Sequence, residues 1–139
     1  MIYVWDNSGE PVDTLRWDEQ PRPIDDALVA AVVEQETKYL DATAAAQRRR
    51  SLEEDPRPAT APVFDRLLLG PDGEVWVRRF DDPRAEASEW LVFGEDGELG
   101  ARVRTPHERE IRAVGRDRVY TVELDEYDVE YVQAYPLRR

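Results

Sequence analysis

The chain has 139 residues, a length typical of one domain, and its 31 acidic against 19 basic residues give a formal net charge of −12. Such a negative field repels phosphate backbones and anionic lipid surfaces, so the composition argues against nucleic-acid and membrane binding, although an acidic DNA mimic is conceivable. The absence of cysteine excludes disulfides, thiolate metal sites and cysteine nucleophiles.

The beginning of the chain has none of the features of a secretory signal. A basic region followed by a long apolar run is missing there, and no later stretch approaches the ~18 consecutive apolar residues of a membrane span. From the sequence as written we therefore expect a soluble, cytoplasmic protein.

Residues 1–22 predict an N-terminal β-hairpin. An apolar strand, a turn ending in Gly9-Glu10 and a second strand follow one another between Ile2 and Val12. The same pattern returns around Gly73-Glu74 and around Gly97-Glu98. Glycine takes the positive φ that closes a short hairpin, and the Asn or Asp before it accepts local backbone hydrogen bonds, so all three stretches predict hairpins.

Residues 23–55 form a helical insertion. The segment 24–52 has no turn residues and predicts one long helix that Asp25 caps, with a break near residues 41–43 compatible with the pattern. Leu28, Val32 and Tyr39 follow a spacing of three to four residues or a multiple of it, which makes an apolar stripe. Either the sheet or a partner chain has to cover this stripe.

A proline-rich linker, residues 56–62, separates the helix from a β-meander over residues 63–139. Short apolar strands alternate with turns in this part, which indicates antiparallel pairing rather than a parallel sheet. The sequence therefore predicts a mainly β protein, an antiparallel meander with one long inserted helix. The expected strands of the meander are 63–69, 75–80, 89–94, 98–104, 109–114, 118–123 and 128–135.

Candidate chemical groups are few, and we predict no cofactor and no catalytic residue. His107, the single histidine, lies in a polar turn without a recognisable partner nearby in sequence, which favours an exposed loop. Asp125, Glu126 and Asp128 are the best candidates for a metal site, because a tight turn gathers their oxygens. None of the acidic clusters has the pattern of a calcium loop, so a solvated surface is the simpler interpretation.

The meander resembles bacterial six-bladed β-propeller proteins. Residues 62–69 and 72–78 are similar to the start of a blade, residues 90–99 to its outer hairpin, and residues 110–137 to the final blade and its closing phrase. Residues 2–17 resemble more weakly the outer hairpin of a preceding blade. The resemblance implies about two blades of a family whose complete members carry some six and are exported.

The resemblance also implies association. Two blades leave outer faces bare and strand edges unpaired, so we expect a homo-oligomer formed through edges or blade faces. The last blade offers three strands, and a fourth could come from the chain's own residues 12–17 or from a second copy. The residues expected at interfaces are Leu28, Val32, Tyr39, Trp5, Trp17, Tyr131 and Tyr135.

Three functions are compatible with these observations. The first is a non-catalytic module for binding or self-assembly, with an unknown ligand. The second is a propeller-type hydrolase or lyase, or a metal-binding protein, that becomes complete on oligomerisation. The third is a truncated fragment without an independent function.

Overall fold

The computed structural model describes residues 1–127 and 129–138, which form nine strands and two helices in a mainly β fold, as the sequence predicts. The strands make three antiparallel sheets with the orders β1-β2, β3-β4-β5-β6 and β7-β8-β9. The elements are β1 Ile2–Trp5, β2 Pro11–Leu15, α1 Asp26–Thr37, α2 Ala42–Glu54, β3 Phe64–Leu69, β4 Val75–Arg79, β5 Ser88–Phe93, β6 Leu99–Thr105, β7 Glu110–Val114, β8 Arg118–Leu124 and β9 Glu130–Pro136.

The three predicted Gly-Glu turns are hairpin turns in the structure. Gly9, Gly73 and Gly97 have φ values of 86°, 78° and 74°, in the left-handed region that only glycine enters without strain. All seven strands expected between residues 63 and 139 are present, with ends that differ by at most two residues from the expected ones. The residues of the turns were therefore sufficient to predict the meander.

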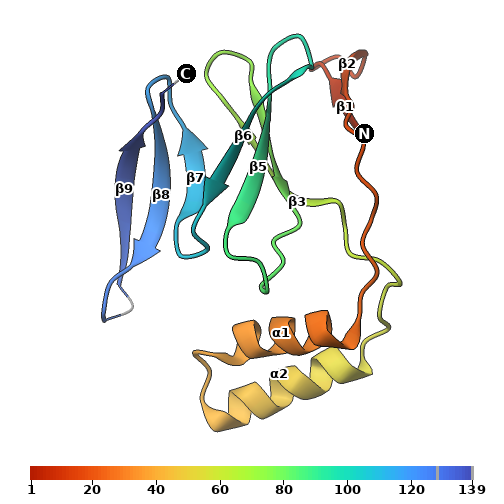
Figure 1. Cartoon of the computed structure of the whole chain (residues 1–139), viewed down its shortest axis with the longest axis vertical. Coiled ribbons are helices and arrows are strands. Elements are labelled where there is room, and N and C mark those ends of the chain that lie inside the picture. The colour runs from red at the N-terminus through yellow and green to blue at the C-terminus, as the bar shows by residue number, and fades with distance from the viewer. Residues whose placement is uncertain (128, 139) are drawn as a thin grey trace.

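The sheets stack face to face, and the four-stranded sheet lies in the middle. Figure 1 shows the β1-β2 hairpin on one side of this middle sheet and the β7-β8-β9 sheet on the other. Because side chains alternate along a strand, β4 and β5 supply both interfaces. The strands in the middle of the stack are accordingly apolar on both faces.

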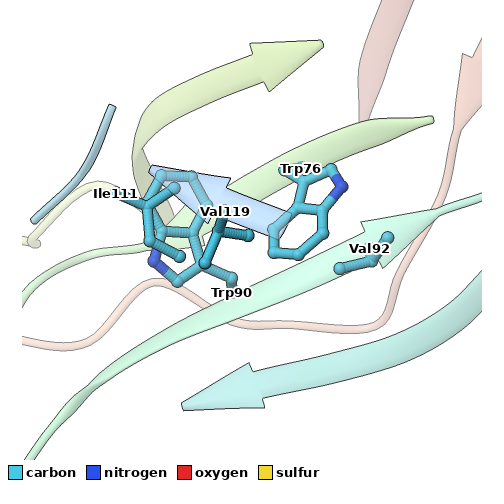
Figure 2. Close-up of a cluster of buried hydrophobic side chains, with 5 residues drawn as sticks. All are labelled: Trp76, Trp90, Val92, Ile111 and Val119. Atoms are coloured by element: carbon cyan, nitrogen blue, oxygen red, sulfur yellow. The ribbon is translucent and has the colours of Figure 1, made fainter. Parts of the chain in front are cut away.

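One face of the middle sheet packs against the C-terminal sheet. Trp76 and Trp90 meet edge to face, with ring centroids 6.4 Å apart. Figure 2 shows these two indoles with Val92, Ile111 and Val119, all buried in one cluster. This contact is the joint between the two larger sheets, because Ile111 and Val119 belong to β7 and β8.

The opposite face of the middle sheet packs against the N-terminal hairpin. Leu15 from β2 is buried with Val77, Leu91 and Phe93. Trp17, just after the hairpin, places its ring 5.5 Å from that of Phe93. Of the two alternatives for a fourth strand of the last sheet, residues 12–17 of the same chain do not supply it, since β2 pairs with β1 and docks on the far side of the middle sheet.

The helical insertion is a hairpin of two helices and not one long helix. Asp25 caps α1 as expected, and its Oδ1 accepts from the Leu28 amide at 2.7 Å. The chain reverses after Thr37, and Asp41 caps α2 by accepting from the amides of residues 43 and 44, both at 2.9 Å. The capping aspartate starts a second helix, which is the physical reason for the break. Tyr39 consequently lies outside both helices, 70% exposed.

The two linkers that carry this helical hairpin run antiparallel to each other. The Ile24 amide donates to the Ala59 carbonyl oxygen at 3.1 Å, and the Ala61 amide donates to the Arg22 carbonyl oxygen at 2.8 Å. Pro23 and Thr60 form a bridge between these bonds. The proline-rich linker is thus paired, and the helices stand beyond one end of the sheet stack (Figure 1).

Candidate functional site

A pocket of about 260 Å³ lies at the end of the middle sheet, between the β4-β5 loop and the paired linkers. We call it the loop-end pocket. Its walls carry charged side chains of both signs together with backbone of the linkers. Its lining includes Glu19, Arg22, Arg79, Asp81, Asp82, Ser88, Glu89 and Arg104.

Arg79 forms the centre of the first charged group. Its guanidinium donates to the carboxylates of Glu19, with the Nε–Oε1 distance 2.7 Å, and of Glu89. The hydrogen bond from Arg79 lowers the pKa of the Glu89 carboxyl, and the two carboxylates raise the pKa of Arg79 in return. The positive charge of Arg79 is thus balanced by carboxylates of the same chain, and the group ties the segment after β2 to the sheet.

Asp82 forms the centre of the second group. It accepts from Arg84 at 2.8 and 2.9 Å, and Arg22 of the linker lies 3.9 Å away. Arg84 also reaches Asp25, the cap of α1, at 3.0 Å. The pKa of Asp82 is lowered chiefly by the hydrogen bond from Arg84. The pKa of Asp25 is lowered first by the amide of Leu28 and then by Arg84.

These lowered pKa values make the protein less stable in acid. A carboxyl with a depressed pKa in the folded state contributes stability above its unfolded pKa of about 4, and this stability is lost as the pH falls through the folded value. We expect the urea concentration at the unfolding midpoint to decrease as the pH drops below about 4, and we expect this decrease to be smaller in Asp82→Asn. The exposed Glu126→Gln serves as the control. Identical pH profiles for Asp82→Asn and the parent chain would contradict the assignment.

Ser88, His107 and Asp81 meet at the rim of the loop-end pocket. The Ser88 hydroxyl donates to Asp81 Oδ1 at 2.8 Å, and His107 Nδ1 lies 3.0 Å from the same oxygen. His107 Nε2 lies 2.7 Å from the carbonyl oxygen of Ala85, an acceptor to which it donates. His107 lies in a turn, as the sequence indicates, but it is half-buried, and its partners come from the β4-β5 loop, distant in sequence.

The three side chains have the types of a serine-hydrolase triad but not its arrangement. In a triad the serine proton goes to an imidazole nitrogen, which acts as the base. Here Ser88 Oγ and Asp81 Oδ1 both lie at the same imidazole nitrogen, His107 Nδ1, at 3.3 and 3.0 Å, and the other nitrogen is engaged by the backbone carbonyl of Ala85. The contacts therefore fix the β4-β5 loop to the turn before β7.

The predicted metal site is only partly described. Asp125 Oδ1 accepts from the amides of Tyr127 and Val129, at 2.8 and 2.9 Å, so this carboxylate closes its own turn. Glu126 is exposed, and Asp128 lies outside the described residues. Within residues 1–127 and 129–138, no group of three or more histidine or acidic side chains is placed to hold a metal ion. The metal site stays a prediction.

The two predicted interface tyrosines of β9 come together on Glu123. Tyr135 donates to Glu123 Oε1 at 2.6 Å and Tyr131 to Oε2 at 3.4 Å, while the Arg109 guanidinium lies 4.9 Å from the centroid of the Tyr135 ring. The hydrogen bond from Tyr135 lowers the pKa of Glu123, and the same bond raises the pKa of Tyr135. The sequence did not single out Glu123, which lies opposite Tyr131 in the β8-β9 pair.

The other predicted interface residues lie apart from one another. Leu28 is buried and Val32 half-buried beside an apolar recess between α1 and the linker. Trp17 packs inside the chain, with its ring 6.2 Å from that of Phe64. Trp5 lies on the outer face of the N-terminal hairpin, 59% exposed.

Among the described residues, neither helix is long and apolar enough to cross a membrane. Comparison of the chain with family models, with curated proteins and with solved structures gave no match, so the propeller resemblance rests on the residues given above.

Proposed function

We propose that the chain is a non-catalytic, propeller-like module that works by association with other copies of itself. The observation that carries this proposal is the difference between the middle sheet and the two end sheets. The middle sheet has cover on both faces, whereas each end sheet packs with one face only. On the bare sides, Tyr3 is 60% exposed and Val132 is 68% exposed.

The stacking of the sheets supports the propeller-like part of the proposal. In a propeller, consecutive meander sheets pack face to face around an axis, and their first strands lie nearest to one another. Here β3 and β7, the first strands of two consecutive sheets, approach each other, and Arg66 of β3 forms an ion pair with Glu110 of β7. A propeller-like chain with so few sheets leaves end faces that further copies can cover.

The chemistry of the loop-end pocket supports the non-catalytic part. The guanidinium of Arg79 is held between two carboxylates, and Asp82 is held by Arg84. Ser88 and Asp81 lie at the same nitrogen of His107, so these three side chains lack the order of a serine-hydrolase triad. Groups paired in this way tie segments together and leave little free to act on a substrate.

The test is the mass of the chain in solution as a function of concentration. We expect light scattering to give a mass above the 16.1 kDa of one chain, which rises with protein concentration. Higher salt should strengthen the association, because the net charge of −12 makes the copies repel one another. A mass of 16.1 kDa at all concentrations and at both low and high salt would refute the proposal.

A further inference from the structure

Strand β9 is the edge strand with the least protection in the two larger sheets. Proteins guard free edges with bulges, charges or prolines, because an open row of amides pairs readily with another strand. β9 keeps an unbroken register with β8 over seven residue pairs, and Glu130 is its one charged residue. Pro136 stands only at its end. Six of its seven residues are exposed.

The other edges of the two larger sheets are better guarded. β6 carries Arg102 and Arg104, and its register with β5 shifts between Val92 and Phe93. The pairing of β3 with β4 is irregular between Phe64 and Arg66. β7 has the same kind of irregularity in its pairing with β8, between residues 111 and 113. The contrast singles out β9 as an edge suited to pairing.

The hydrogen bonds at both ends of the β8-β9 ladder show which amides of β9 face outward. The Leu137 amide donates to the Asp117 carbonyl oxygen, and the Asp125 amide donates to the Val129 carbonyl oxygen. On an antiparallel strand, the backbone N–H and C=O groups of successive residues point alternately toward the partner strand and away from it. The backbone groups of the odd-numbered residues of β9 therefore point toward β8, and those of Val132 and Ala134 point toward the open edge.

The sequence of β9 is nearly the same when it is read in reverse. Around Gln133 the order is Tyr-Val-Gln-Ala-Tyr, from residue 131 to residue 135. Two antiparallel copies centred on Gln133 place Val132 opposite Ala134, and Tyr131 opposite Tyr135, in both directions. Glu130 then faces Pro136, so no like charges oppose each other. A second copy of this strand is thus a better complement than a strand of unrelated sequence.

We infer that two copies of the chain pair antiparallel through β9, about a two-fold axis at Gln133, and join their C-terminal sheets into one continuous sheet. This inference rests on the proposed function and names its partner and contact. The outward amides and carbonyls of Val132 and Ala134 bond one another across the axis. Gln133 meets its own copy as a non-hydrogen-bonded pair, whose Cα atoms lie about 4.5 Å apart.

The first test removes one outward amide. Val132→Pro deletes an N–H group that faces away from β8, so the ladder within the chain keeps its bonds. Val132→Ala is the matched control, because it shortens the same side chain and keeps the amide. We expect the proline variant to weaken the dimer by about tenfold or more in sedimentation, and the alanine variant to dimerise like the parent chain. Near-ultraviolet circular dichroism confirms that each variant is folded.

The second test reads the register with single cysteines, which the chain otherwise lacks. In Gln133→Cys the two sulfurs face each other across the axis within the range of a disulfide, so mild oxidation should give a covalent dimer. In Ala134→Cys the two cysteines are displaced along the strands and should link far more slowly. Comparing these two variants requires no purified monomer, and oxidation traps the dimer even if it is weak.

The results separate this inference from the proposed function. If both cysteine variants link equally slowly and Val132→Pro dimerises like the parent, while Trp5→Asp abolishes association, the β9 contact is wrong and association through a face stands. If the parent chain never exceeds the mass of one copy, both proposals fail. Faster linking of Gln133→Cys together with a weakened Val132→Pro dimer supports the β9 contact.

Discussion

Replacing Trp90 with alanine is expected to remove about 3–5 kcal/mol from the free energy of unfolding, which is a large part of the 5–15 kcal/mol typical of a domain. Trp90 is buried at the joint between the middle and C-terminal sheets. Its loss leaves a cavity there, removes the edge-to-face contact with Trp76 and uncovers the guanidinium of Arg78, which lies 5.9 Å from the centroid of its ring. The measurement is urea unfolding followed by far-ultraviolet circular dichroism.

Leu69→Ala provides the control for this experiment. Leu69 is an apolar residue of the same sheet but is 77% exposed, so its truncation should shift stability by less than about 0.5 kcal/mol. If Trp90→Ala lowers the free energy of unfolding no more than Leu69→Ala does, with an unchanged dependence on urea concentration, the two larger sheets do not pack through Trp90.

Replacing Leu15 with aspartate is expected to detach the N-terminal hairpin. Leu15 is buried against Val77, Leu91 and Phe93, and an unpaired carboxylate at this place costs several kcal/mol. The hairpin docks through one face, so it can leave the middle sheet while β4 and β5 stay packed on the C-terminal sheet. Hydrogen exchange should show amide protection in β1 and β2 reduced by about a hundredfold or more.

The outer face of the same hairpin supplies the control. Val12→Asp places the same charge at a position that is largely exposed, so β1 and β2 should keep their protection. Equal loss of protection for the two variants would show that any charge in the hairpin unfolds it. Loss of protection in β4 and β5 to the same extent as in β1 and β2 would show that the stack unfolds as one unit.

The sequence predicts most of the β structure, because its signals are local. A glycine of positive φ behind an aspartate or asparagine defines each hairpin within four residues, and Gly73 and Gly97 illustrate this. Alternation then places Trp76 and Val77 on opposite faces. The choice of which sheet covers which face depends on packing between distant segments, and for this reason the sequence left the docking of residues 12–17 open.

The pocket was harder to predict than the strands for the same physical reason. His107 is separated by 22 residues from the carbonyl of Ala85 and by 19 from Ser88, and no pattern in the sequence links these loops. Glu123 lies opposite Tyr131 only in the observed register of β8 and β9, which the predicted strands alone do not give. The helix break had a visible signal in Asp41, whose short acidic side chain suits the start of a helix.

The bridge between Pro23 and Thr60 has a consequence for how this architecture tolerates change. Since the two linkers lie side by side at Pro23 and Thr60, residues 24–59 form an insertion whose two ends are next to each other. Lengthening, shortening or exchanging this insertion changes the register of no strand. Related chains could therefore vary widely there while they keep the same sheets.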